Sequence, residues 1–353
     1  MRSARSSRSR RTLLFGLAAF ALTQGAFACL VLSDPVLPRE DHWQRKLRQY
    51  RPRVAAHPDA VVAVQLGSSR TGFGVRGTQA EPWLSDRLGR PVVLFNMGLC
   101  GSGPAATLVN LRGMLDDGVR PHLLLLEVLP PLLDDGDVLE DLEPERLPAG
   151  QMRLGEAAVT AALAGKERPW LWAEWLGAQA VPTCTHRQTL LSLSFPRLLS
   201  PEARRDGVRG ADESGYVPVR HHSAEEAARA LNAARMDYEP VLRRFRLSRR
   251  RLDLVGETIE TARREGMAVA LVLMPEGPAF RSWYPPGTWP LIFGAVEDLA
   301  REQGVPLINL REALDEDDLI DSHHATVEGA RKLTLELARR IEPLLREAAR
   351  GSP

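Results

Sequence analysis

Five short apolar runs, separated by stretches with helical spacing, constrain the fold of this chain more than any other feature. The runs are Val61–Leu66, Pro91–Phe95, Leu123–Val128, Met267–Met274 and Pro306–Leu310. Near-continuous apolar runs of this kind are typical of parallel strands that are buried on both faces. Helices are expected at 105–116, 252–265, 291–303 and 329–346. This alternation predicts an α/β fold, a three-layer α/β/α sandwich around a central parallel sheet.

The alternation fails between about residues 134 and 250, where we expect a largely helical insertion. Residues 224–251 are expected to be mostly helical, with a break or kink at Pro240. Three tryptophans lie close together at positions 170, 172 and 175. We expect them to pack in a core or cap, with a sugar groove or a membrane contact as the alternatives. The pair His221-His222 is expected to lie at the surface.

The N-terminal residues predict a membrane anchor. Residues 13–32 carry no charge, and about 20 apolar residues suffice for a helix that spans a bilayer. The arginines before this run would hold the N-terminus in the cytoplasm. We therefore expect a basic segment and signal anchor over residues 1–33, a juxtamembrane linker over 34–59, and the α/β domain over 60–348.

Two alternatives to the anchor remain open. A cleaved signal peptide would be cut near Ala26-Phe27-Ala28, and a lipoprotein would carry its lipid on Cys29. Each interpretation places the body of the chain outside the cytoplasm. We therefore expect a single-pass protein of the cell membrane whose folded domain is extracytoplasmic.

The charge distribution excludes some partners. Five arginines precede the first acidic residue, and removing their charge from the formal net +1 leaves −4 for the remainder. A mildly acidic body is a poor candidate for sequence-independent nucleic-acid binding, which depends on neutralising phosphates. Cysteines and histidines do not cluster with the spacing of a zinc site, so neither a metal nor a cofactor is expected.

Three segments carry residues suited to chemistry. Gly67-Ser68-Ser69 follows the first strand, the glycine-rich loop 96–104 follows the second, and Asp321-Ser322-His323-His324 precedes the last helix. Taken singly, they also fit a helix cap, a tight turn and a capping aspartate. Together they supply a hydroxyl nucleophile, a base and an orienting carboxylate, provided that the carboxyl ends of the strands bring them together.

The order of these segments resembles the SGNH/GDSL hydrolase superfamily. Gly67-Ser68-Ser69 is similar to its first block, residues 96–101 (Asn-Met-Gly-Leu-Cys-Gly) to its second, and Asp321-x-x-His324 to its last. The resemblance covers roughly residues 60–132 and 267–345 and implies an SGNH or flavodoxin-like sheet. It implies Ser69 as nucleophile, His324 as base, Asp321 as its orienting partner, and the N–H groups of Ser69 and Gly101 as oxyanion donors. The spacing favours His324 over His323 as the base.

One block of the family pattern is missing. An asparagine that supplies a third oxyanion donor should follow the third strand, but residues 127–132 read Glu-Val-Leu-Pro-Pro-Leu. Loss of one such donor typically costs about 10²–10³ in rate. Arg70 could help to complete the hole. Candidate substrate contacts are Arg70, Asn96, Gly98 and Glu276, the last of which also suits a structural turn.

The resemblance implies a membrane-anchored serine esterase or O-acyltransferase that acts on an acylated carbohydrate or another envelope ester. The alternative is a non-catalytic scaffold subunit of a cell-envelope polysaccharide assembly, which the missing asparagine favours. A phosphate-binding protein is a weaker interpretation, because the glycine-rich loop lacks the lysine of a P-loop.

Overall fold

The computed structural model describes residues 2–33, 42–135, 152–163, 168–187, 191, 195–198, 210–219 and 223–351. The chain forms two compact units. One comprises Met1–Gln44 and Pro148–Asp206, and the other comprises Arg45–Leu147 and Gly207–Pro353. The second unit holds the whole sheet and is called the catalytic unit below, because it contains the candidate catalytic residues.

A five-stranded parallel sheet forms the centre of the catalytic unit, in the order β2-β1-β3-β4-β5. The strands are β1 (Val61–Gly67), β2 (Val92–Gly98), β3 (Leu123–Glu127), β4 (Ala268–Leu273) and β5 (Leu307–Asn309). All five predicted strands are confirmed, with ends that differ by up to three residues. The strand order reverses at β1, between β2 and β3, and ligands of open α/β sheets bind at the carboxyl edge beside such a reversal.

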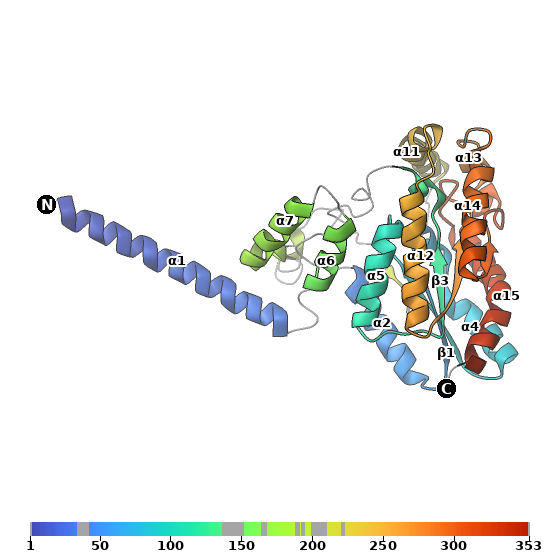
Figure 1. Cartoon of the computed structure of the whole chain (residues 1–353), viewed down its shortest axis with the longest axis horizontal. Coiled ribbons are helices and arrows are strands. Elements are labelled where there is room, and N and C mark those ends of the chain that lie inside the picture. Colours follow the sequence, from blue (N-terminus) through green and yellow to red (C-terminus); the bar gives the residue numbers. More distant parts are fainter. Residues whose placement is uncertain are drawn as a thin grey trace. The chain divides into compact units, whose positions relative to one another are not determined.

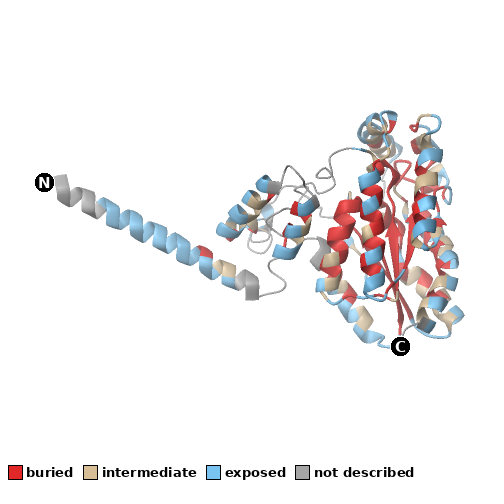
Figure 2. Ribbon diagram, in the orientation of Figure 1, coloured by how far each residue is buried: buried red, intermediate tan, exposed pale blue. Residues whose placement is uncertain are grey.

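Helices cover both faces of the sheet, which confirms the predicted three-layer sandwich (Figure 1). They are α4 (Gly77–Leu88) and α15 (Val327–Gly351) on one face, and α5 (Pro104–Asp116), α12 (Arg249–Arg264) and α14 (Thr288–Gln303) on the other. The short helices are α3 (Ser69–Gly74), α13 (Pro278–Arg281), η2 (Pro130–Leu133) and η8 (Glu316–Asp318). Figure 2 shows burial concentrated in the strands and in the helix faces against them.

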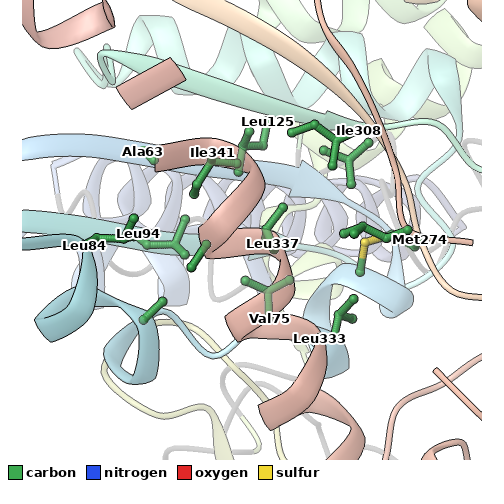
Figure 3. Close-up of a cluster of buried hydrophobic side chains, with 14 of the residues drawn as sticks. Ala63, Val75, Leu84, Leu94, Leu125, Met274, Ile308, Leu333, Leu337 and Ile341 are labelled. Atoms are coloured by element: carbon green, nitrogen blue, oxygen red, sulfur yellow. The ribbon is translucent and has the colours of Figure 1, made fainter. Parts of the chain in front are cut away.

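A buried hydrophobic core between the sheet and the helices α4 and α15 stabilises this side of the sandwich. Successive strand residues point to opposite faces, so Ala63, Leu94 and Leu125 share the face that meets Leu84 of α4 and Leu337 of α15 (Figure 3). All five side chains are fully buried. Each buried leucine of this kind stabilises the fold by about 1.5–3 kcal/mol relative to an exposed one.

The predicted helical stretch 224–251 is two helices, and its break is not at Pro240. Helix α11 (Ala224–Arg243) contains Pro240, and the chain leaves helical structure only after Arg243. The break forms because the connecting backbone pairs with another segment: Ser248 N–H donates to Leu133 O, and Leu247 bridges Asp134. Tertiary pairing thus decides where the helix ends.

The first unit contains the N-terminal helix α1 (Arg2–Ser33) and the helices α6 (Leu154–Leu163), α7 (Arg168–Ala180), α8 (Pro182–Thr185) and η6 (Pro196–Leu198). Within α1, Ser9–Cys29 is long and apolar enough to cross a membrane. A helix of this length and composition near the N-terminus fits a membrane anchor or a signal sequence. His221-His222 lies outside the described residues.

The three tryptophans of α7 only partly follow the expected core packing. Trp172 and Trp175 are half-buried against each other at 5.7 Å between ring centroids, and the indole of Trp175 donates to Met152 O. Trp170 is 54% exposed, whereas its neighbour Leu171 is buried. Neighbouring positions of a helix point in different directions, so only one of these two can enter the small core.

The segment expected to be a juxtamembrane linker contains the helix α2 (His42–Ala56), and most of it belongs to the catalytic unit. Lys46, Leu47 and Tyr50 are buried on it. The Lys46 ammonium donates to Asn96 O and Gly215 O, each at 2.9 Å, and to Asn96 Oδ1 at 3.4 Å. The compact unit therefore starts at about Arg45 rather than at residue 60.

Stability should depend on pH through Lys46, because burial lowers its pKa to about 7. An unfolded lysine holds its proton up to about pH 10.4, so between pH 7 and 10 the unfolded chain binds more protons than the folded chain. The free energy of unfolding contributed by this group therefore rises with pH over that window, and the cost of burying the charge is fully present below pH 7.

We expect the loss of thermal stability caused by Lys46→Met to be larger at pH 9 than at pH 6.5. Circular dichroism of the purified full chain in detergent measures it. The control is Lys332→Met, which removes a half-exposed lysine. The hydrogen bond with Asp318 raises the pKa of Lys332, so the effect of Lys332→Met on thermal stability should be the same at pH 6.5 and pH 9. Equal effects of Lys46→Met at both pH values would contradict the prediction.

Candidate active site

Ser69 stands at the carboxyl end of β1, as the first residue of α3. Its predecessor Ser68 caps this helix, and its hydroxyl accepts the Arg70 N–H at 3.1 Å. Ser68 is buried whereas Ser69 is half-buried. The turn thus directs one serine into the protein and leaves the other at the surface of the site.

A buried carboxylate, Glu127 at the end of β3, holds this turn. It accepts hydrogen bonds from Ser68 N–H at 2.7 Å, from Ser68 Oγ at 2.7 Å and from Thr71 Oγ1 at 2.6 Å. Gly67 is needed beside it, because a Cβ there would lie 2.2 Å from Glu127 Oε2. The sequence reasoning did not identify this role. The sequence feature that could have indicated it is the acidic residue at the end of an otherwise apolar strand.

The structure brings the three predicted catalytic residues together. His324 Nε2 lies 2.7 Å from Ser69 Oγ, although the two residues are 255 positions apart. His324 Nδ1 lies 2.8 Å from Asp321 Oδ2. These distances are those of the nucleophile, base and orienting carboxylate of a serine relay. His324 is 19% exposed in its side chain, so a substrate can reach the pair.

The loop before α15 positions Asp321 and His324 through its own backbone. The second oxygen of Asp321 accepts the N–H groups of His323 and His324, and Ile320 N–H donates to His324 O. Ser322 takes a positive φ of 66°, which non-glycine residues rarely adopt. Gly329 allows the helix to start close by, since a Cβ there would lie 2.0 Å from Asp318 O.

The electrostatics of this loop favour an ionised Asp321. Burial alone would raise its pKa, but the hydrogen bond with His324 outweighs burial and lowers the pKa. An ionised carboxylate can hold the imidazole in one tautomer and stabilise the imidazolium that forms when Ser69 loses its proton.

His323 packs on His324 but does not contact Ser69 in the described hydrogen bonds. Its ring lies 3.9 Å from that of His324 and is enclosed by Tyr238 and Phe280. Burial lowers the pKa of His323 well below the ordinary value, and the charge of His324 lowers it further. His323 is therefore neutral, and the geometry selects His324 as the partner of Ser69.

The atoms of Asp321, His323 and His324 are close enough to suggest a metal site, since one ligand atom of each lies within 4.8 Å of the others. However, His324 places one ring nitrogen toward Asp321 and the other toward Ser69. Neither nitrogen is then left for a metal ion. The cluster fits proton transfer better than metal binding.

Two of the four expected substrate contacts are structural instead. Asn96 is fully buried, and its amide donates to the carbonyls of Thr71 and Val75 at 2.7 Å each while its oxygen accepts Gly98 N–H. A Cβ on Gly98 would lie 2.4 Å from Gly72 N. Both residues dock α3 against β2, so they hold the nucleophile helix and do not face a substrate.

The other two expected contacts, Arg70 and Glu276, are also inside the protein. Glu276 is completely buried and accepts hydrogen bonds from Arg70 at 3.0 Å, Arg311 at 2.6 Å and Tyr284 at 2.7 Å. Arg70 is 2% exposed and lies over the ring of Phe280. In this conformation neither residue can touch a substrate, and Arg70 does not serve as an oxyanion donor.

The glycine-rich loop lies next to the end of β1. Leu99 N–H donates to Gly67 O at 2.8 Å, and Ser102 N–H donates to Leu99 O. Gly101 has a positive φ of 66° and is half-buried. A glycine suits this turn because other residues seldom adopt that φ.

The block expected to carry asparagine is filled by apolar residues. Val128, Leu129 and Pro130 follow β3 and are buried, and Val128 N–H donates to Val272 O. No side chain at these positions can donate to an oxyanion. The departure from the family pattern is therefore also a feature of the structure.

A pocket of about 490 Å³ lies at the end of β5, lined by residues that include Trp289, Arg311 and Lys332. It contains none of the three relay residues. Its cations are largely neutralised: Lys332 pairs with Asp318, and two arginines of α15 pair with Glu336. It is thus not the place where Ser69 would meet an ester.

The chain is thus a three-layer α/β protein with a serine, a histidine and an aspartate in relay geometry at the carboxyl edge of its sheet. The chain is similar to the crystal structure of TesA (13% identity, 80% of this chain and 99% of that chain, TM-score 0.37). It is also similar to an inhibitor-bound aryl esterase of M. smegmatis (12%, 81% and 100%, TM-score 0.36) and to a carbohydrate acetylesterase family member from Sinorhizobium meliloti (14%, 82% and 98%, TM-score 0.34).

A protein-family model also matches residues 219–346, with a description that names no activity. A search of curated proteins finds no match. At such low identities and TM-scores, likeness carries no argument about chemistry. The case for an activity depends on the geometry of Ser69, His324 and Asp321.

Glu127→Gln should lower the free energy of unfolding and loosen the turn that holds Ser69. The amide nitrogen would face a donor of Ser68 or Thr71 whose hydrogen bond the carboxylate accepts in the wild type. Leaving a buried donor unpaired costs about 1–3 kcal/mol, or a fall in melting temperature of several degrees. Thermal unfolding of the full chain in detergent measures the loss. The control Glu257→Gln alters a half-exposed carboxylate paired with Arg112 and should change stability little. An unchanged melting temperature for Glu127→Gln would remove the anchoring role.

Proposed function

We propose that this protein is a serine esterase or O-acyltransferase of the SGNH type, anchored in a membrane, that acts on an acylated carbohydrate or another envelope ester outside the cytoplasm. The observation that carries the proposal is the continuous relay from Ser69 Oγ through His324 to Asp321, at 2.7 and 2.8 Å. An Asp321 that only capped a helix, beside a His324 at the surface, would not require His324 to contact both Asp321 and Ser69.

In the proposed mechanism Ser69 Oγ attacks the ester carbonyl while His324 Nε2 takes its proton. Asp321 holds the other ring nitrogen and stabilises the imidazolium. The N–H groups of Ser69 and Gly101 stabilise the oxyanion. His324 then protonates the departing alkoxide, the C–O bond of the ester breaks, and an acyl-Ser69 intermediate remains.

The second half of the reaction reverses these roles. His324 removes a proton from an incoming hydroxyl, which attacks the acyl carbon and releases Ser69. Water as the acceptor gives hydrolysis, and a sugar hydroxyl gives acyl transfer. With only two backbone donors for the oxyanion, turnover should be slower than in a site with three, by about 10²–10³.

The N-terminal helix supports the proposed location. Ser9–Cys29 has the length and composition of a single membrane span, and arginines precede and begin it. By the positive-inside rule, the chain that follows it would lie on the opposite side from the cytoplasm.

Ser69→Ala should abolish turnover of a short-chain aryl ester and labelling by a serine-directed fluorophosphonate. Ser69 carries the hydroxyl that lies within hydrogen-bond distance of His324, so it is the group expected to form the covalent adduct. Both assays use the full chain in detergent, with circular dichroism to verify folding. Ser282→Ala, which changes an exposed serine of another turn, is the control and should keep both signals.

This experiment also tests the second candidate function, a non-catalytic scaffold, which the apolar replacement of the third oxyanion donor favours. A wild-type chain that neither labels nor turns over ester would support the scaffold. Ester turnover that survives in Ser69→Ala would place the activity elsewhere.

Asp321→Asn should lower kcat by about 10²–10⁴-fold and leave KM nearly unchanged, because the amide favours the wrong tautomer of His324. Steady-state kinetics with the same aryl ester measure the effect. Asp253→Asn removes an exposed carboxylate paired with Arg249 and should have wild-type kinetics. A loss confined to KM would show that Asp321 acts in binding rather than in proton transfer.

A further inference from the structure

One polar residue of the apolar helix α1 is covered, and its cover comes from the insertion. The described residues of α1 from Ser9 onward are exposed except Gln24, which is 8% exposed, and half-buried Phe27 and Ala28 (Figure 2). These three positions share one helix face, since they are three and four residues apart. The cover is α8, in the same compact unit.

The contact is specific. Gln24 Oε1 accepts two hydrogen bonds from Thr183, one from its hydroxyl at 2.9 Å and one from its backbone N–H at 3.3 Å. The ring of Phe27 lies 6.3 Å from that of His186. A glutamine in a membrane span requires hydrogen-bond partners, because lipid tails offer none. Thr183 meets this requirement for the carbonyl oxygen of Gln24.

The position of Gln24 sets a depth for α8. Gln24 precedes Cys29, the last residue of the candidate span, by five residues, which is about 7 Å along a helix. Interfacial helices lie with their apolar face about 5–10 Å into the boundary of headgroups and acyl chains. If α1 crosses the bilayer, α8 is held at that depth, at the end of the span away from the N-terminal arginines.

The helices next to α8 expose side chains that fit this environment. Exposed large apolar residues of this unit outside α1 are Leu154 (62%), Trp170 (54%), Leu176 (59%), Phe195 (63%) and Leu198 (70%). Over residues 168–187 the charged side chains are only Arg168, Glu174 and Arg187. Tryptophan is enriched at membrane interfaces, where its ring can be apolar at one end and hydrated at the other.

We infer that α6, α7, α8 and η6 form a membrane-interface element that docks on the anchor through Gln24 and Thr183 and inserts Trp170, Leu176, Phe195 and Leu198 into the outer leaflet. The partner is the lipid bilayer itself. This inference rests on the membrane anchoring in the proposed function and adds a second attachment to it. The insertion thereby acquires a role that the relay does not explain.

The test places an environment-sensitive fluorophore (NBD) at Leu176→Cys in the full chain, with Cys29, Cys100 and Cys184 changed to serine. The matched control carries the probe at Leu291→Cys, a leucine of the catalytic unit that is 53% exposed, close to the 59% of Leu176. Both proteins are placed in phosphatidylcholine nanodiscs with and without a doxyl-labelled phosphatidylcholine. Quenching by the doxyl lipid should be strong at position 176 and weak at position 291.

Two further variants separate this inference from the anchoring. Gln24→Leu keeps α1 apolar, so the chain should remain in the membrane after carbonate extraction, whereas quenching at position 176 should fall. Thr183→Ala should lower quenching in the same way. Equal quenching at positions 176 and 291 in a carbonate-resistant chain would overturn the interface element alone. Blue-shifted but unquenched fluorescence at position 176 would also overturn it, by indicating contact with protein.

Release of the wild-type chain by carbonate would overturn the anchoring and the interface element together. Neither result bears on the relay, since ester turnover by Ser69 can be measured in detergent. Resistance to carbonate, with strong quenching at position 176 that Gln24→Leu reduces, would support the inference.

Discussion

The carboxylate of Glu127 is the constraint on which the candidate site depends. It accepts hydrogen bonds from Ser68 and Thr71, the residues on either side of the Ser69-Arg70 pair, and it can approach only because Gly67 has no side chain. A buried carboxylate must have such partners, since an unpaired one would be strongly destabilising. The nucleophile turn and the end of β3 therefore stabilise each other, and Ser69 is held with little freedom at the edge of the sheet.

The sheet order explains how distant residues form one relay. β1 lies between β2 and β3, where the strand order reverses, so the loops after β1 and β2 open beside this reversal. His324 arrives from the C-terminal loop at the same edge and meets Ser69 across 255 positions of sequence. The asparagine missing after β3 is replaced there by buried apolar residues, while the last residue of β3 serves the turn as an anchor.

Much of the site could be predicted because its residues have chemistry that few other roles need together. Ser69, Asp321 and His324 stood in the right order at expected strand and helix ends, and their side chains meet. Asn96, Gly98, Arg70 and Glu276 were misinterpreted for the opposite reason. Each lies at a strand end beside the site, but burial and hydrogen-bond partners decide whether such a residue faces a substrate or supports the backbone. Lys46 and Glu127 were missed because their roles depend on partners that only packing supplies.

The α/β class, the five strands and the apolar N-terminal helix could be predicted from sequence, because they follow from local hydrophobic periodicity and from residue type. The tertiary structure decided where helices end, as at the pairing of Leu247 with Asp134, and which histidine faces Ser69. It also decided that α2 belongs to the catalytic unit and that Gln24 is paired with Thr183. These outcomes depend on contacts between residues far apart in the chain, and no local pattern encodes the free energy of burying a charge or of satisfying a buried polar group.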